Sequence, residues 1–358
     1  MLRAPRESAI AARSGRCLRR SWPASGPQDG RFHDDSKPPA RGMTAPIHRR
    51  MTAMEWAILL MLASVWGGSF LFITLALHSF PPLTLVWLRC TLASLGLFAL
   101  LRITGTRLPR DLPAWLAFLR LGVLNVALPF GLVAWSQLHI ATGLASILNA
   151  TTPLWGVIVC HLFTRDEKAT RGKVIGVVLG MAGVAAMIGG DAFVGLDSNL
   201  PAQIACVAAA LSYAFAGLFS RGFAERGIAP IQVAAGQLIA AAALLLPIAL
   251  IADAPWRLPL PHAESLAALA ALGLVSTALA YILFFRLVET AGATNALLVT
   301  FLVPISAILL GMAFLGESLA PRHLTGMALI ALGLAAIDGR LFSRLFSLWR
   351  AGPAARPG

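Results

Sequence analysis

A stripe of polar residues runs along one face of an otherwise apolar segment, residues 140–163. At spacings of four, three and four residues, its members are Thr142, Ser146, Asn149 and Pro153. These spacings place the side chains on one face of a helix. The amide of Asn149 both donates and accepts hydrogen bonds, so it can hold a zwitterion or another polar solute. The alternative is a hydrogen bond between helices, worth ~0.6–2 kcal/mol. The sequence leaves both interpretations open.

Two prolines lie inside predicted helices at positions where they affect polar groups. A proline within a helix removes the hydrogen bond to the carbonyl four residues earlier. Pro153 would free the carbonyl of Asn149, and Pro304 would free that of Thr300. Freed carbonyls inside a membrane are tolerated where they face protein or water, and they can accept a hydrogen bond from a substrate ammonium. We interpret both prolines as helix breaks or hinges; a kink that only shapes the helix bundle is the alternative.

Further polar side chains fall inside apolar segments. Asn125 lies about 13 residues into the predicted helix 112–138, ~20 Å along its axis, and its type favours an interhelical hydrogen bond. Arg89 lies several residues inside the predicted helix 82–101, so it either pairs with an anion or extends toward the surface. Polar groups at such depth are usually retained for function or for helix contacts. The candidate substrate-binding residues are Trp66, Ser69, Arg89, Asn125, Ser146, Asn149, Tyr281 and Thr300.

No carboxylate is expected near the middle of any apolar segment. Glu55, Glu264, Glu289 and Asp338 all fall at segment ends, whereas proton-coupled pumps commonly place a carboxylate at depth. Carboxylate-based proton antiport is therefore unsupported. The sequence also has no CxxC, no His/Cys metal spacing and no paired carboxylates or Ser/His/Asp set. We expect no catalytic residue, no metal and no cofactor.

The composition indicates a membrane protein. The 358 residues are 58% hydrophobic and 13% charged, whereas soluble domains average about 45–50% apolar and roughly 25% charged. The formal charge of +13 does not indicate nucleic-acid binding, because it is concentrated in one tail and in loops. Residues 1–50 alone hold 11 Lys and Arg against 4 Asp and Glu.

The first 53 residues are predicted to form a disordered basic tail, since they contain no apolar run with which to build a core. An organelle transit segment and a translation start assigned too far upstream are the alternatives. The last is favoured, with Met43, Met51 and Met54 as later starts. Residues 339–358 are expected to form a second, cytoplasmic tail.

Between the tails, the length and continuity of the apolar runs predict ten transmembrane helices rather than a barrel. Five lie in each half of the chain. The predicted spans are residues 54–77, 82–101, 112–138, 140–163, 172–188, 202–219, 230–251, 266–288, 294–314 and 324–337.

Loop charges predict the orientation of these spans. Basic residues, such as Arg107, Lys168 and Arg226, lie in the loops after spans 2, 4, 6 and 8. The loops after spans 1, 3, 5, 7 and 9 hold only Arg257 and Arg322. Because positive residues accumulate on the cytoplasmic side, both termini are expected to be cytoplasmic.

The two halves contain a glutamate and two glycines at the same spacing. Glu167, Gly176 and Gly183 recur 150 residues later as Glu317 (317−167), Gly326 (326−176) and Gly333 (333−183). Such self-similarity predicts a duplicated unit. Because five spans is an odd number, the second copy must insert upside down, as in many secondary transporters. We expect each glutamate to cap the helix that follows it.

Several motifs within this frame resemble the EamA family of the drug/metabolite transporter superfamily. They are Trp66-Gly67-Gly68-Ser69-Phe70, Arg89, the segment from Gly143 to Pro153, and the segment from Ala296 to Pro304 followed by Leu315-Gly316-Glu317. The resemblance covers about residues 55–338. It implies a ten-helix permease that moves small metabolites, often amino acids or related compounds.

The sequence therefore predicts an all-α integral membrane protein with two inverted five-helix repeats, residues 54–190 and 201–338. The predicted function is a secondary transporter of a small polar metabolite, working by alternating access in the bacterial inner (plasma) membrane. Its expected partners are that metabolite and the lipid bilayer, and nucleic acid is not expected. The alternatives are a membrane-embedded enzyme and a channel or scaffold. The cargo, the direction of flux, the coupling ion and any oligomeric partners remain open.

Overall fold

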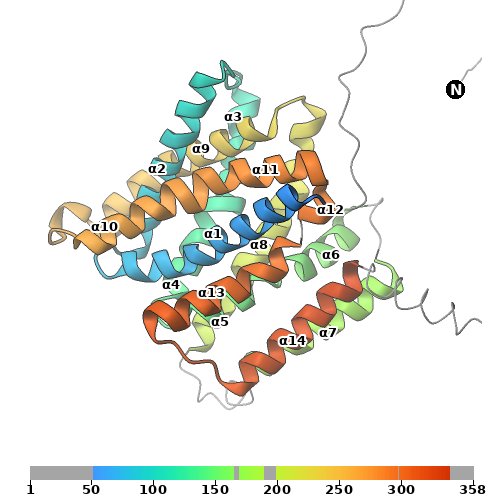
Figure 1. Cartoon of the computed structure of the whole chain (residues 1–358). Coiled ribbons are helices and arrows are strands. Elements are labelled where there is room, and N and C mark those ends of the chain that lie inside the picture. The colour runs from blue at the N-terminus through green and yellow to red at the C-terminus, as the bar shows by residue number, and fades with distance from the viewer. Residues whose placement is uncertain (1–50, 165–168, 189–198, 297, 339–358) are drawn as a thin grey trace, which may run out of the picture. The chain divides into compact units, whose positions relative to one another are not determined.

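The computed structural model describes residues 51–164, 169–188, 199–296 and 298–338. Within these ranges every regular element is helical and there is no β-strand (Figure 1). The predicted tail 339–358 and all but the last three residues of the predicted tail 1–53 lie outside the described residues. Glu167 lies outside them as well.

The first half of the chain forms long helices joined by short connections. Three of its elements follow one another without a break, as α3, the π-helix η1 and α4. The elements are α1 (Ala53–Leu77), α2 (Pro82–Ile103), α3 (Leu112–Gly122), η1 (Val123–Ala127), α4 (Leu128–Ser136), α5 (Thr142–Asn149), α6 (Thr152–Phe163) and α7 (Arg171–Ile188).

The second half repeats this order. A second π-helix, η4, again lies within a long span, between α10 and α11. The elements are α8 (Leu200–Glu225), α9 (Pro230–Asp253), the short 3-10 helix η3 (Pro255–Arg257), α10 (Ala263–Ala270), η4 (Ala271–Leu279), α11 (Ala280–Ala291), α12 (Ala293–Ala296), α13 (Val299–Leu315) and α14 (Pro321–Asp338).

Local sequence explains where the helices begin. At α1, the Thr52 hydroxyl accepts a hydrogen bond from the Glu55 amide at 3.3 Å, and the Glu55 carboxylate accepts one from the Thr52 amide at 2.7 Å. This reciprocal cap satisfies two donors that a helix start leaves unpaired. Pro82 and Pro230 occupy the first positions of α2 and α9, where the fixed φ of proline suits a helix and its missing N–H costs nothing.

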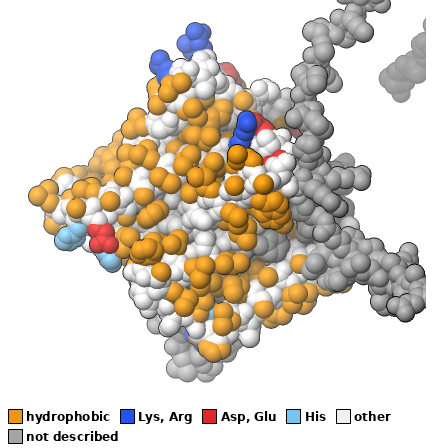
Figure 2. Space-filling model, viewed as in Figure 1, with side chains coloured by type: hydrophobic (Ala, Val, Ile, Leu, Met, Phe, Trp, Pro, Cys, Tyr) orange, Lys and Arg blue, Asp and Glu red, His pale blue; other side chains and the backbone are white. Residues whose placement is uncertain are grey.

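The helices carry the surface expected of a membrane protein. Seven helical segments of the described chain are long and apolar enough to cross a bilayer, and α13 and α14 contain shorter apolar stretches. Apolar side chains cover much of the face shown in Figure 2, and charged side chains sit mainly near its margins. A surface of this kind is stable in contact with lipid and unfavourable in water.

Two predicted helices are interrupted rather than continuous. The predicted helix 140–163 divides into α5 and α6, with residues 150–151 between them, and the predicted helix 294–314 divides into α12 and α13. Pro153 stands in the first turn of α6, directly after the break, as expected of a break marker. Pro304 differs, because it lies inside the continuous helix α13. The interruption in that span comes earlier, near residue 298.

Glycines bring α7 and α14 into close contact, and the two helices run side by side in Figure 1. A Cβ added to Gly176 would lie 2.5 Å from the carbonyl oxygen of Gly333, and one added to Gly333 would lie 2.5 Å from that of Gly176. Only glycine permits backbones to approach so closely. Gly176 and Gly183 of α7 therefore form a packing surface against α14 of the other half.

Candidate substrate cavity

All eight candidate residues from the sequence line one cavity of about 380 Å³. Pro153 lines it as well, whereas Pro304 is not among the lining residues. Known sites for small molecules occupy about 300–1,000 Å³, so the cavity suits a small metabolite. Both halves of the chain contribute to it. Further lining residues include Phe130, Tyr213, Ser276, Thr277 and Phe284.

Arg89 provides the charge of the cavity. Its side chain is only 6% exposed, and its Nε donates a hydrogen bond to Oγ1 of Thr277 at 2.9 Å. The guanidinium carbon lies 3.7 Å from the centre of the Phe130 ring, a cation–π contact. Thr277 in turn donates to the carbonyl of Leu272 at 2.8 Å. The guanidinium is therefore fixed on one edge and one face.

None of the described residues that line the cavity is an aspartate or a glutamate. Within the described part of the chain, Arg89 makes no ion pair, and Thr277 is its hydrogen-bond partner. The cavity thus presents one positive charge surrounded by amides, hydroxyl groups and aromatic rings.

A neutral network stands on another wall. Nδ2 of Asn125 donates to Oε1 of Gln237 at 3.0 Å and to the Tyr281 hydroxyl at 3.3 Å. Nε2 of Gln237 also donates to the Tyr281 hydroxyl, at 3.1 Å. The phenol oxygen accepts two hydrogen bonds, so its own proton stays available as a donor. Asn125 therefore joins helices, as its type indicated, and also lines the cavity.

The broken helix supplies the polar face foreseen in the sequence. Ser146 and Asn149 line the cavity, while Thr142, the first member of the predicted stripe, does not. Oγ of Ser146 donates to the carbonyl of Gly143 at 2.7 Å. Oδ1 of Asn149 is enclosed and has no hydrogen-bond partner among the described residues. An enclosed amide oxygen without a partner is unfavourable, so this side chain is poised to change its contacts.

The carbonyl of Asn149 is not free, contrary to the expectation from Pro153. It accepts a hydrogen bond from Oγ1 of Thr152 at 2.8 Å. A threonine hydroxyl can satisfy a backbone group released by a proline three or four residues away. The side chain of Asn149, rather than its carbonyl, is the group left for a ligand.

Glu317 caps a helix, but not the one that follows it in sequence. Its carboxylate accepts hydrogen bonds from the amide of Thr142 at 2.7 Å, from Oγ1 of Thr142 at 2.6 Å and from the amide of Gly143 at 3.2 Å. These groups form the N-terminus of α5, where a negative charge is favourable. Residues from the second half therefore hold the broken helix of the first half in place.

The aromatic wall of the cavity depends on close packing of α1. The ring centres of Trp66 and Phe284 are 5.6 Å apart. Next to Trp66, a Cβ on Gly67 would lie 2.9 Å from the backbone nitrogen of Ala307, so α13 approaches α1 directly at this glycine. The Ser306 hydroxyl donates to the carbonyl of Ala63 at 2.8 Å and strengthens that contact.

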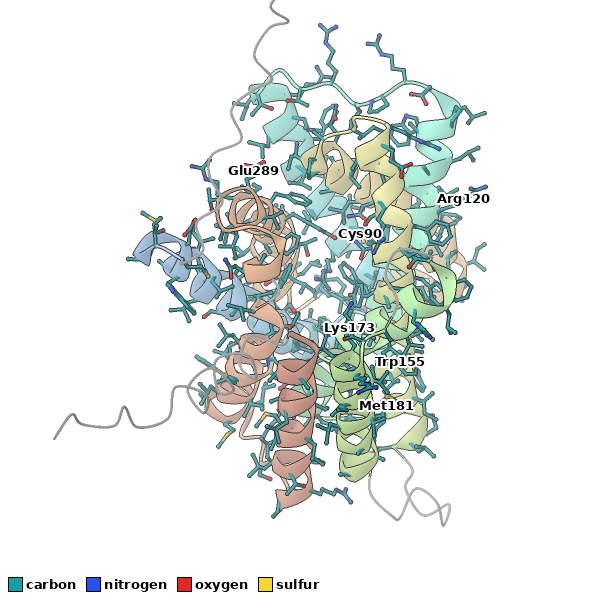
Figure 3. All side chains as sticks on the ribbon, turned by 90° about the vertical axis from the view of Figure 1, so that its right-hand side faces the viewer. Cys90, Arg120, Trp155, Lys173, Met181 and Glu289 are labelled. Atoms are coloured by element: carbon teal, nitrogen blue, oxygen red, sulfur yellow. The ribbon has the colours of Figure 1, made fainter. Side chains whose placement is uncertain are left out.

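Other charged residues lie away from this cavity. Arg120 and Glu289 are exposed, and both labels stand toward the periphery in Figure 3. In the described residues there is no cluster of three or more His, Cys, Asp or Glu side chains that could hold a metal ion. Among the described residues that line the cavity, Arg89 is the one with a charged side chain.

The sequence analysis overlooked Gln237, which links Asn125 to Tyr281. A signal was present, because Gln237 follows Pro230 by seven residues, as Arg89 follows Pro82 by seven. The π-helices η1 and η4 were not foreseen either, although they carry Asn125 and Thr277. Segments of π-helix occur frequently at functional sites.

Comparison with known proteins identifies the family. Two stretches of the chain, residues 54–189 and 200–337, each match the EamA-like transporter family. The chain belongs to this family. The family model matches the chain twice, and the described residues include seven helices that are long and apolar enough to cross a membrane. The protein is therefore a multi-pass membrane protein of the transporter type.

Individual relatives of this EamA-like protein are distant but extend along most of its length. An uncharacterized transporter of Archaeoglobus fulgidus is 25% identical over 78% of this chain and 97% of its own. The uncharacterized inner membrane transporter YedA of Escherichia coli is 26% identical over 72% of this chain and 81% of its own. A probable terminal-alkyne amino-acid exporter of Streptantibioticus cattleyicolor is 26% identical over 82% of this chain and 96% of its own.

A solved crystal structure is similar to this EamA-like chain with a TM-score of 0.59. It is 20% identical in sequence and covers 83% of this chain and 99% of its own. The fold is therefore one already observed by experiment.

Proposed function

We propose that this EamA-like protein moves a small polar metabolite, such as an amino acid or a derivative, across the bacterial inner membrane by alternating access. The observation that carries the proposal is the cavity between the two halves, which polar side chains from both halves line. A cavity at the junction of two repeats is where secondary transporters bind their cargo. The exporter from Streptantibioticus cattleyicolor supports the cargo class, since its name specifies an amino acid.

Alternating access requires two halves that can exchange roles, and we propose two inverted repeats of five spans each. The double family match supports this arrangement. The contacts between helices support it as well, because a contact between two spans recurs between the corresponding spans of the other half. The α1–α13 contact corresponds to that of α8 with α5 and α6, the α2–η4 contact corresponds to α9–α3, and α7 packs on its own counterpart α14.

The polarity of the loops supports the orientation within this proposal. Basic residues follow the spans that end on the proposed cytoplasmic side, as membrane insertion favours. Both termini are then cytoplasmic. A channel or a membrane-embedded enzyme would be the alternative. An enzyme would be favoured by a carboxylate pair or a metal-binding cluster, and the described lining residues hold neither.

The test replaces Asn149 by leucine, whose side chain has the same number and branching of heavy atoms but no polar group. Metabolite profiling of medium and cells, with and without overexpression, identifies compounds whose levels depend on the protein. Flux of those compounds through proteoliposomes should fall by about fivefold to 150-fold in Asn149→Leu, because a polar contact within an enclosed site typically contributes about 1–3 kcal/mol. Ser64→Val is a suitable control, since Ser64 is exposed and bonds only its own helix.

Wild-type flux through Asn149→Leu would remove Asn149 from the site. Flux that rises linearly with concentration, without saturation, would contradict alternating access and favour a channel. Normal elution of the variant in size-exclusion chromatography ensures that a loss of flux reflects the site rather than folding.

A further inference from the structure

We infer that the cargo is an organic monoanion whose carboxylate or comparable oxyanion binds Arg89. This inference rests on the proposed function, and it specifies the charge of the transported molecule. It depends on the charge balance of the cavity, on the geometry of the guanidinium and on the lack of a carboxylate among the described lining residues.

The positive charge of Arg89 has no counter-charge among the described residues. Arg89 is 6% exposed and lies seven residues into α2, ~10 Å along the helix axis. Arginine within a membrane span is unfavourable unless it pairs with another group or with a ligand. The described residues place no carboxylate in the cavity lining and give Arg89 no ion pair. An anionic cargo would supply the missing counter-charge.

The geometry of the guanidinium also suits an oxyanion. Nε is occupied by Thr277, and Phe130 covers one face of the group. The two terminal nitrogens have no hydrogen-bond partner among the described residues, so they remain for a ligand. An arginine held in this way offers parallel N–H donors that match the two oxygens of a carboxylate.

Tyr281 supplies a further donor in the same cavity. Its oxygen already accepts hydrogen bonds from Asn125 and Gln237, so the hydroxyl can only donate to a ligand. A cavity whose fixed groups are a cation and an O–H donor stabilises negative charge. The aromatic side chains of Trp66 and Phe284 provide an apolar surface for the remainder of the cargo.

A cationic or zwitterionic cargo fits this lining less well. An ammonium group would find neutral oxygens and ring faces but no carboxylate, and it would share a cavity of about 380 Å³ with Arg89. Two like charges within a site of low polarity repel each other strongly. The amino-acid derivatives that satisfy the cavity are therefore those without a free ammonium, such as 2-oxo acids or N-acyl amino acids.

The experiment compares matched compounds of different charge. Proteoliposomes are loaded with equal amounts of 3-methyl-2-oxobutanoate, valine and valinamide, and of N-acetylphenylalanine, phenylalanine and phenylalaninamide. The compound identified by metabolite profiling is added to the same vesicles. We expect the wild-type protein to release at least one of the monoanions at least tenfold faster than its zwitterionic and cationic counterparts. The profiled compound should itself be a monoanion.

Variants at position 89 then test the assigned residue. Arg89→Gln should reduce release of the monoanions at least tenfold and abolish the preference for charge, whereas Arg89→Lys should retain part of it. Ser64→Val is the control, because Ser64 is exposed and bonds only within its own helix. Because the preference is measured in the wild-type protein, the inference can be tested even if one of the variants does not fold.

The outcomes separate the two proposals. If the profiled compound is released but is a cation or a zwitterion, the inference fails and the proposed function stands. Unchanged monoanion release by a folded Arg89→Gln variant also overturns the inference. If no compound is released faster than from loaded vesicles that lack the protein, the proposed function fails and the inference fails with it.

Discussion

Arg89 and Gln237 occupy the same position in the two halves of the chain. Each lies seven residues after the proline that begins its helix, α2 or α9. Each also contacts the π-helix of the opposite half: Arg89 bonds Thr277 in η4, and Gln237 bonds Asn125 in η1. The contact is therefore similar in the two halves while the chemistry differs. One half provides a charge that faces the cavity, and the other provides a neutral network.

The interrupted helices show the same contrast. Ser146 and Asn149 give the break between α5 and α6 a polar face. On the opposite side, the lining residues from α12 and α13 are mainly apolar, and the exception is Thr300. The two interrupted helices thus have a related backbone but differ in the polarity that they present to the cavity. In the proposed mechanism, selection of cargo depends on this asymmetry, while the exchange between two conformations depends on the similarity.

The glycine contact between α7 and α14 gives the largest expected effect, because here the halves are alike. Gly176→Leu and Gly333→Leu should each destabilise the protein by about 3 kcal/mol, the upper part of the range for overpacking, since a Cβ meets backbone at 2.5 Å. Thermal unfolding in detergent measures this. Gly217→Leu is the matched control, because no atom lies within 4 Å of its added Cβ.

If one of these two variants were stable and the other were not, the contact would not be equivalent in the two halves. A small effect of both would contradict the close backbone approach itself.

Gln237→Leu gives a smaller effect and tests where the halves differ. The substitution removes the hydrogen bonds to Asn125 and Tyr281 without removing a charge. We expect a loss of about 1–2 kcal/mol in stability and a threefold to tenfold loss of flux, less than for Arg89→Gln. Both quantities are measured on the same purified protein. An effect on flux as large as that of Arg89→Gln would show that the charge has no special role.

Much of the candidate site could be predicted from the sequence, because a polar side chain within an apolar span usually faces other helices or a cavity rather than lipid. The eight candidate residues, from Trp66 to Thr300, were selected by type and depth, and the fold brings them to one cavity. The helical fold likewise followed from the apolar runs. These inferences depend on local properties, namely length, hydrophobicity and helical spacing.

The remaining features depend on contacts between distant parts of the chain. Glu317 caps α5 rather than α14, and its partner Thr142 lies 175 residues away. No local rule identifies such a partner. The π-helices could not be predicted either, because their extra residue adjusts the register of a span to neighbours on both sides. Pro304 was expected to break its helix, yet α13 continues through it, since neighbouring groups in a membrane helix can compensate for a proline.

The central claim, that one cavity opens to either side of the membrane in turn, is tested most directly by labelling a cysteine within it. Val303 lines the cavity and is partly exposed there. Val303→Cys is introduced into protein whose native cysteines have been replaced, and a membrane-impermeant thiol reagent is applied to intact cells and to inverted vesicles. The account predicts labelling from both sides, slowed by the transported compound. Labelling from one side only, whatever the cargo gradient, would contradict it.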